Sequence, residues 1–185
     1  MADDLPIIVT LQVDEVSDSL FQTARQEYYP PAINYVNAHL TLFHNLPGVR
    51  FDSIMNEIAR TCAAQPAFHL SVAEVMRLGR GVAYKIEAPP LLALRKTLAA
   101  KFKPWLTGQD AQNFRPHVTI QNKVSPEQAS ALYGKLKADF SPWQGMAQGL
   151  QLWFHEGGAR PSGHWRPAGA IGFAPPLALS AERGS

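Results

Sequence analysis

The chain has a single cysteine, Cys62, so no disulfide bond can form within it. No motif that would activate a thiol surrounds Cys62. Together with the apolar residues of 51–62, Cys62 falls on one face of a predicted helix. We therefore expect a small buried side chain here. The single cysteine excludes a disulfide-rich scaffold, and its place on the apolar face of a predicted helix argues against a cysteine nucleophile.

Long apolar runs are absent as well. No stretch approaches the roughly 18 apolar residues that a membrane-spanning helix needs. The chain does not open with a basic segment followed by an apolar one, as a secretory leader does. These observations favour a cytoplasmic protein with no membrane partner, and we expect it to be a monomer.

A strong charge of either sign is lacking. Lysine and arginine number 17 against 15 aspartates and glutamates, for a formal net charge of +2. This balance permits an anionic substrate but not the dense basic surface of a dedicated duplex binder.

Motifs for cofactors and metals are also missing. No glycine-rich loop resembles a Walker or dinucleotide fingerprint, so we expect no cofactor. His39 and His44 are five residues apart, which places them on opposite faces of a strand. The remaining histidines outside the motifs described below are scattered, and we expect no metal site.

The chain has 185 residues, of which 46% are hydrophobic, enough for a sizeable core. Alternation and helical spacing predict a series of elements. The predicted strands are 5–14, 38–44, 67–78, 81–88, 116–121, 149–156 and a weaker 169–174. The predicted helices start near residues 17, 51, 91 and 126, and 103–114 and 157–169 are expected to be loops.

The predicted order repeats: each half reads strand, helix, strand, helix, strand. Such a repeat predicts an α+β fold with two lobes, 5–78 and 81–155, against which the C-terminal segment packs. We expect two antiparallel-rich sheets that face a central cleft, with the helices on the outer faces.

A His-x-Thr tripeptide occurs once in each half, in "HLTLFH" (39–44) and "PHVTIQ" (116–121). Residues two apart in a strand share a face. The first shared face holds His39, Thr41 and Phe43, and the second holds Arg115, His117, Thr119, Gln121 and Lys123. If the apolar sides pack under the helices, both histidine faces border the cleft.

Two imidazoles and two hydroxyls in one cleft suit phosphoryl chemistry without a metal. One neutral imidazole can accept a proton while the other, protonated, donates one. Threonine hydroxyls can hydrogen bond to phosphate oxygens as charge develops on them. A single His-x-Thr tripeptide means little, but two at equivalent positions of a repeat indicate function. Which histidine is the base stays open.

The two motifs, their spacing and the repeated topology resemble the 2H phosphoesterase superfamily, in particular its bacterial 2′-5′ RNA ligase-like members. The resemblance covers about residues 5–155. It implies a bilobal fold and metal-free chemistry on 2′,3′-cyclic phosphates or 2′-5′ phosphodiesters. It also implies that His39 and His117 are the catalytic pair and that Thr41 and Thr119 hold the phosphate. Several relatives carry an arginine shortly after the second motif, where this chain has Lys123.

Other candidate contacts are less specific. We expect Arg115 and Lys123 to bind substrate at the edge of the cleft. Phe43 could stack on a nucleobase or pack in the core. Tyr35, Trp105 and Trp153 are expected to be packing or rim residues.

The function expected from these observations is a phosphodiesterase for RNA ends or small nucleotides that carry a 2′,3′-cyclic phosphate. The reverse reaction would join such an end to a 5′-hydroxyl as a 2′-5′ ligase. Alternatives are hydrolysis of 2′-5′-linked oligonucleotides or of another small phosphodiester, and a module that binds nucleotides or RNA ends without turnover.

Overall fold

The computed structural model describes residues 4–157 and 164–175. Four α-helices of 14 residues occur where helical spacing predicts them. They are α1 (Glu15–Tyr28), α2 (Phe51–Ala64), α3 (Pro89–Phe102) and α4 (Pro126–Asp139). The strands are β1 (Ile7–Val13), β2 (Thr41–Leu46), β3 (Phe68–Leu78), β4 (Gly81–Glu87), β5 (His117–Gln121), β6 (Trp143–Glu156) and β7 (His164–Gly172). The last strand therefore begins earlier than the predicted 169–174.

The start of α4 follows the sequence signal. Ser125 accepts a hydrogen bond from the backbone of Gln128, whose side chain accepts one from the backbone of Ser125, and proline stands at the first helical position. This capping box with proline satisfies exposed N–H groups and presets the helix. Helix α1 is capped by Asp14, three residues before the predicted start near Ser17.

The strands form a single hydrogen-bonded sheet in the order β2-β1-β6-β3-β4-β5, with β7 paired to β6. The pairings between these strands are antiparallel. The α+β class is confirmed, but the two expected sheets are joined into one. The reason is that β6 begins at Trp143 rather than 149 and pairs with both halves. Its Ala147 lies opposite Val13 of β1 and also opposite Phe68 of β3.

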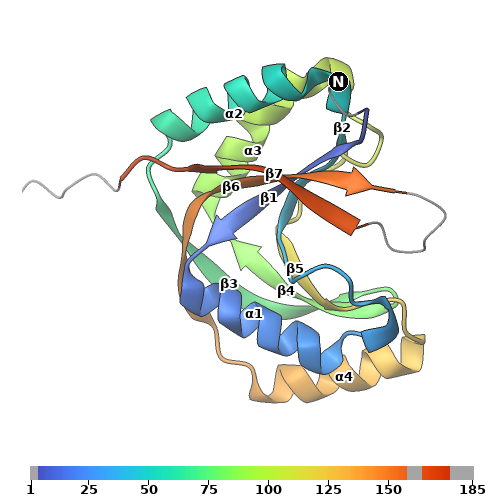
Figure 1. Cartoon of the computed structure of the whole chain (residues 1–185). Coiled ribbons are helices and arrows are strands. Elements are labelled where there is room, and N and C mark those ends of the chain that lie inside the picture. The colour runs from blue at the N-terminus through green and yellow to red at the C-terminus, as the bar shows by residue number, and fades with distance from the viewer. Residues whose placement is uncertain (1–3, 158–163, 176–185) are drawn as a thin grey trace, which may run out of the picture.

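The helices form two layers with the strands between them. Figure 1 shows α2 and α3 at one end of the molecule and α1 and α4 at the other. Helix α1, from the first half, packs against β5, whereas α3, from the second half, packs against α2. The two halves of the chain thus exchange helices. Each helix layer contains one helix from residues 5–78 and one from residues 81–155.

The core is continuous and apolar. Its largest fully buried side chains include Phe43, Phe102, Ile54, Ile58 and Leu98. Cys62 of α2 is also fully buried, as expected, and burial raises the pKa of its thiol to about 11. Among the described helices, none is long and apolar enough to cross a membrane.

Candidate active site

Both motif histidines are oriented by the same backbone contact. The Nδ1 atom of His39 lies 2.6 Å from the carbonyl oxygen of Asn37, and that of His117 lies 2.7 Å from the carbonyl oxygen of Arg115. A carbonyl oxygen only accepts, so each Nδ1 donates the hydrogen. In the neutral imidazole, Nε2 then carries the lone pair and is the atom that can take up a proton. The sequence repeat therefore extends to ring orientation.

The two motif threonines open β2 in one case and lie in the middle of β5 in the other. Thr41 lies opposite Thr10 of β1, and Thr119 lies opposite Ala83 of β4. Both threonines are partly exposed. Neither side-chain hydroxyl hydrogen bonds to another residue in 4–157 or 164–175. Both hydroxyls are therefore free to donate to a bound anion.

His39 is held in its neutral form. The pKa of its imidazole is lowered to about 4, mainly because burial disfavours the charged form. The hydrogen bond to Asn37 opposes this lowering, and the electrostatic effects of Arg25, His44 and His117 add to it. Removing an imidazolium from water is unfavourable, so desolvation is the main cause. His117 is among the groups that lower the pKa of His39, which indicates that the two imidazoles lie near each other.

A β-bulge at Leu42 interrupts the alternation of side chains in β2, so residues after Thr41 no longer continue the face that carries His39 and Thr41. Neighbouring residues Val9 and Thr10 of β1 lie opposite Phe43 and Thr41, which are two apart in β2. Leu42 is therefore the extra residue, and the alternation of side chains shifts there. As a result Phe43 turns into the core, where it is 0% exposed and packs against Phe102 at 5.3 Å between ring centroids. Its predicted contact with substrate is wrong, and core packing is confirmed.

The second motif carries the same irregularity. Neighbouring residues Val82 and Ala83 of β4 lie opposite Gln121 and Thr119, again two apart. Gln121 is consequently buried instead of sharing the face of His117, and its side-chain oxygen lacks a hydrogen-bond partner among the described residues. Lys123 follows the end of β5 in the left-handed region, with φ 60°, and is exposed.

A buried arginine contacts the backbone at each bulge. Arg95 of α3 donates from Nε to the carbonyl oxygen of Leu42 at 2.7 Å. Arg25 of α1 donates from its guanidinium to the carbonyl oxygen of Thr119 at 2.8 Å. Each arginine comes from the half of the chain that does not contain the strand it contacts. The carbonyl groups at the bulges are thereby paired, as buried backbone groups must be.

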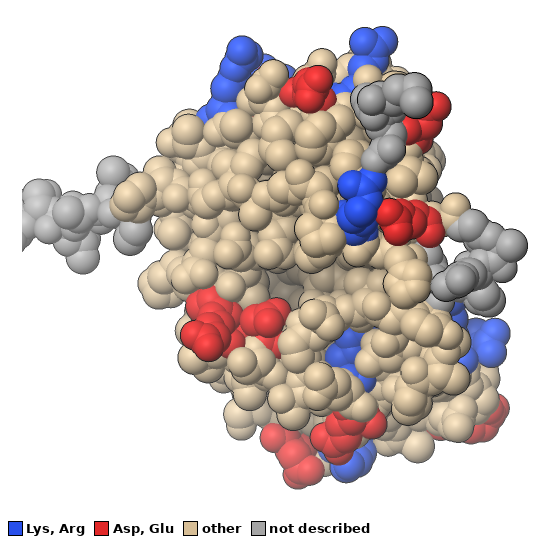
Figure 2. Space-filling model, viewed as in Figure 1, with Lys and Arg blue, Asp and Glu red and all other residues tan. Residues whose placement is uncertain are grey.

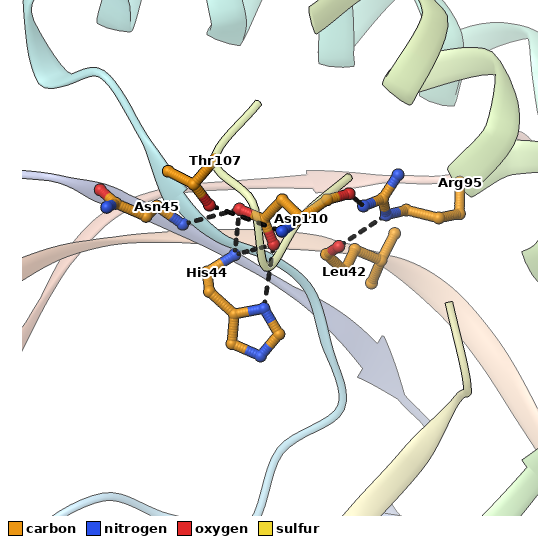
Figure 3. Close-up of polar contacts among 6 residues, drawn as sticks. All are labelled: Leu42, His44, Asn45, Arg95, Thr107 and Asp110. Atoms are coloured by element: carbon orange, nitrogen blue, oxygen red, sulfur yellow. Dashed lines mark hydrogen bonds and ion pairs between the residues drawn. The ribbon is translucent and has the colours of Figure 1, made fainter. Parts of the chain in front are cut away.

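Asp110 fixes the predicted loop 103–114 to β2 (Figure 3). Its buried carboxylate accepts hydrogen bonds from the backbone N–H groups of His44 and Asn45 and from Nδ1 of His44, at 2.9 to 3.0 Å. Burial alone would raise the pKa of this carboxyl, but the hydrogen bonds from His44 and Asn45 hold it below its usual value. Arg95 donates to the Asp110 carbonyl at 2.6 Å. One arginine thus joins the loop to the bulge.

A cavity of about 550 Å³ opens beside His39. Its walls come from β1, the start of α1, residues 35–39, β6 and β7. Figure 2 shows a hollow in this face, with acidic side chains gathered over the start of α1 at its edge. His117 and the two motif threonines are not part of this cavity's lining.

The remaining predicted contacts have different locations. Arg115 is exposed, and its backbone carbonyl orients His117. Neither Arg115 nor Lys123 lines the cavity, and substrate binding by these side chains stays a prediction. Trp105 stacks on Phe102, as a packing residue should, whereas Trp153 forms part of the cavity wall.

Several site residues were not predicted from the sequence. Trp165 lies in the segment expected to be a loop, yet its ring centroid is 4.4 Å from that of His39. Thr10 and Gln12 belong to an apolar strand, where their alternation with Val9 and Leu11 was the available signal. In the described parts of the chain, no group of three or more histidine, cysteine, aspartate or glutamate side chains could hold a metal ion.

Comparisons with known proteins agree on the fold. LigT of E. coli, in its complex with 3′-AMP, superposes with a TM-score of 0.65 at 17% identity, covering 93% of this chain and 99% of LigT. TT0787 of Thermus thermophilus gives 0.67 at 15% identity, covering 92% and 99%. A protein described as a phosphoesterase gives 0.64 at 18% identity, covering 92% and 99%. At these identities the likeness shows the fold.

No curated protein matches the sequence. The family model of the 2′-5′ RNA ligase superfamily, however, matches residues 13–159, which is more than half of the chain. The resemblance seen in the paired motifs is thereby confirmed, and the chain belongs to the 2′-5′ RNA ligase superfamily.

Proposed function

We propose that this protein is a phosphodiesterase that opens 2′,3′-cyclic phosphates by general acid–base catalysis with two histidines and no metal. Membership of the 2′-5′ RNA ligase superfamily and phosphoesterase neighbours support an enzyme. The observation that carries the proposal is the matching orientation of His39 and His117, each with Nδ1 bonded to the carbonyl two residues earlier. Each ring therefore presents Nε2 for proton transfer.

In the proposed reaction, His39 is the base. It is neutral because burial lowers its pKa to about 4, so Nε2 can accept a proton from water as the water oxygen bonds to phosphorus. His117 donates a proton to the ribose oxygen as its bond to phosphorus breaks. The product is a nucleoside 2′- or 3′-monophosphate, and proton exchange with solvent restores the two histidines to their starting forms.

Thr41 and Thr119 would stabilise the transition state. Their hydroxyls, free of partners in the described structure, can donate to the non-bridging oxygens, on which charge accumulates. With a 5′-hydroxyl in place of water as the nucleophile, the same groups would join two ends by a 2′-5′ linkage. His39 would take the proton of the 5′-hydroxyl, the bond from phosphorus to the 3′-oxygen would break, and His117 would donate a proton to that oxygen.

The ligands of similar proteins support nucleotide substrates. E. coli LigT has been crystallised with 3′-AMP, with ATP and with NADP+. Small nucleotides with a 2′,3′-cyclic phosphate, or RNA ends that carry one, are the substrates we propose for this chain. The monomeric state, the cytoplasmic location and the lobe boundaries stay predictions.

The test is hydrolysis of adenosine 2′,3′-cyclic phosphate in the presence of a chelator, followed by phosphorus NMR. We expect one adenosine monophosphate isomer from the wild type and none at the same enzyme concentration from His39→Gln. The variant His69→Gln, in an exposed position of β3, is the control and should keep wild-type turnover. Binding without product, even with excess enzyme, would instead identify a binding module.

A substrate panel separates the proposed substrate from two further phosphodiesters. A 2′-5′-linked dinucleotide and ADP-ribose 1″,2″-cyclic phosphate should be cleaved at least tenfold less efficiently than the nucleoside 2′,3′-cyclic phosphate. The opposite ranking would assign the site to one of those phosphodiesters.

A further inference from the structure

The cavity beside His39 is lined by uncharged polar and aromatic side chains. Gln12, Gln148 and Gln151 contribute amide groups, none of which hydrogen bonds to another residue of the described chain. An amide carries both donors and acceptors, which is the pattern that base edges and sugar hydroxyls require. These three free amides are therefore available to a ligand.

An aromatic wall stands on the side next to His39. The rings of Trp153 and Trp165 lie 6.1 Å apart between centroids, and that of Trp165 lies 4.4 Å from His39. Nε1 of Trp153 donates to the hydroxyl of Thr10 at 2.9 Å, which fixes the indole in place. An indole held in this way stacks a planar base at little cost in side-chain entropy.

The charge of the cavity is unusual for a protein that binds phosphates. Its described lining contains Glu15 and Asp18 but neither lysine nor arginine. Both carboxylates lie in the first turn of α1, over which Figure 2 shows the acidic side chains at the edge of the hollow. A second phosphate in this cavity would meet negative charge, with no lysine or arginine of the described lining to offset it.

From these observations we infer that the cavity is a nucleoside subsite, which takes the base and ribose attached to the phosphate at the two histidines. This inference rests on the proposed function for the place of the phosphate. The base stacks on one of the two indoles, which are tilted by 45° to each other, and the glutamine amides hydrogen bond to its edge. A volume of about 550 Å³ is in the range of small-molecule sites.

The negative charge of Glu15 and Asp18 in the cavity lining limits how many phosphates the preferred substrate carries. The ligand that fits is a nucleoside with one cyclic phosphate, because an RNA chain would bring additional phosphates toward Glu15 and Asp18. The mononucleotide is therefore the preferred substrate, and a cyclic-phosphate end of an oligonucleotide is the poorer one.

The first test removes one amide from the lining of the cavity. Gln151→Leu keeps the size of the side chain and abolishes its hydrogen bonds. We expect the ratio of kcat/KM for adenosine 2′,3′-cyclic phosphate over ethylene phosphate, a cyclic diester without a nucleoside, to fall at least tenfold. The control, Gln144→Leu, changes an exposed glutamine of the same strand outside the cavity and should leave the ratio unchanged. An unchanged ratio in Gln151→Leu would overturn the subsite.

The second test concerns the two carboxylates of the cavity lining, Glu15 and Asp18. Wild-type protein should cleave adenosine 2′,3′-cyclic phosphate at least tenfold more efficiently than a trinucleotide with the same end. Glu15→Gln should narrow this preference, whereas Asp52→Asn, a change in the first turn of α2, should not. Preference for the trinucleotide would contradict the inference and identify an RNA end as substrate.

Binding measurements separate this inference from the proposed reaction. Calorimetry with adenosine alone, which has no phosphate, should show saturable binding that Gln151→Leu weakens at least tenfold. If adenosine binds in this way but no cyclic phosphate is cleaved, the subsite stands and the phosphodiesterase is wrong. If the cyclic phosphate is cleaved but Gln151→Leu weakens adenosine binding no more than Gln144→Leu does, the phosphodiesterase stands and the subsite is wrong.

Discussion

Arg25 of α1 donates a hydrogen bond to the carbonyl oxygen of Thr119, 94 residues further along the chain, at 2.8 Å. Arg95 of α3 forms the corresponding contact with Leu42, 53 residues earlier. Each His-x-Thr strand is thus held at its bulge by a helix from the other half. The exchange of helices explains how two distant motifs are kept in a fixed relation, which proton transfer between them and one phosphate requires.

Replacing Arg25 tests this positioning role. Arg25→Met leaves the Thr119 carbonyl and the Asn34 side chain without their donor, so the free energy of unfolding should fall by about 1–3 kcal/mol. It also removes a positive charge that lowers the pKa of His39. The acid limb of kcat/KM should therefore move to higher pH, which a merely structural role would not cause. Arg60→Met, at an exposed position of α2, is the matched control.

The pH dependence should reveal the lowered pKa of His39. The acid limb of kcat/KM reports the base of the free enzyme, and activity falls as that base is protonated. Because burial lowers the pKa of His39 to about 4, this limb should lie near pH 4 rather than near the ordinary histidine value of about 6.5. Trp165→Ala exposes the ring and should shift the limb upward by about one pH unit or more. The control Trp105→Ala, a change at the ring that stacks on Phe102, should leave the acid limb in place. An acid limb that stays near pH 4 in Trp165→Ala would contradict desolvation of His39 by Trp165.

The Asp110 anchor predicts a specific acid sensitivity. The hydrogen bonds from His44 and Asn45 hold the pKa of this carboxyl below its ordinary value, so the folded state favours the charged form. Its contribution to stability is complete above the unfolded pKa of about 4 and is lost as the pH falls through the folded pKa. Asp110→Ala should lower the free energy of unfolding by about 2–4 kcal/mol at pH 7 and by less at pH 3. Equal losses at both pH values in urea titrations would argue against a charged anchor.

Gly81 provides a test of the second bulge. A Cβ atom at this position would overlap the carbonyl oxygen of Gln121, which is backbone and cannot rotate away. Gly81→Ala should therefore destabilise the protein by about 2 kcal/mol or more. Gly79→Ala, in the same hairpin but with open space around its Cβ position, should stay within about 0.5 kcal/mol of wild type. Similar thermal denaturation of both variants would show that β5 does not approach Gly81 this closely.

Much of the fold could be predicted because it depends on local periodicity. The apolar spacing of Ile54, Ile58 and Cys62, all buried, identifies α2, and the Ser125 cap with its proline identifies α4. The repeat of His-x-Thr located both candidate histidines, because residue type and spacing suffice to show a duplicated polar pair.

The parts that could not be predicted depend on which strands pair. An extra residue at Leu42 turns Phe43 into the core, and alternation read along one strand cannot show it, since the bulge is defined by the register with β1. The single sheet likewise follows from the pairing of Ala147 with both Val13 and Phe68. Trp165 was missed because its proline- and glycine-rich neighbourhood is typical of loops.

The double-mutant cycle of His39 and His117 tests the paired mechanism most directly. The rate constant to measure is kcat/KM for adenosine 2′,3′-cyclic phosphate in the presence of chelator, with folding checked by circular dichroism. We expect His39→Ala and His117→Ala each to lose about 10²–10⁴-fold. The double variant should lose little more than either single one, because groups that act as a unit are not additive. Wild-type turnover in either single variant, or fully multiplicative losses in the double variant, would contradict catalysis by two histidines acting on one phosphate.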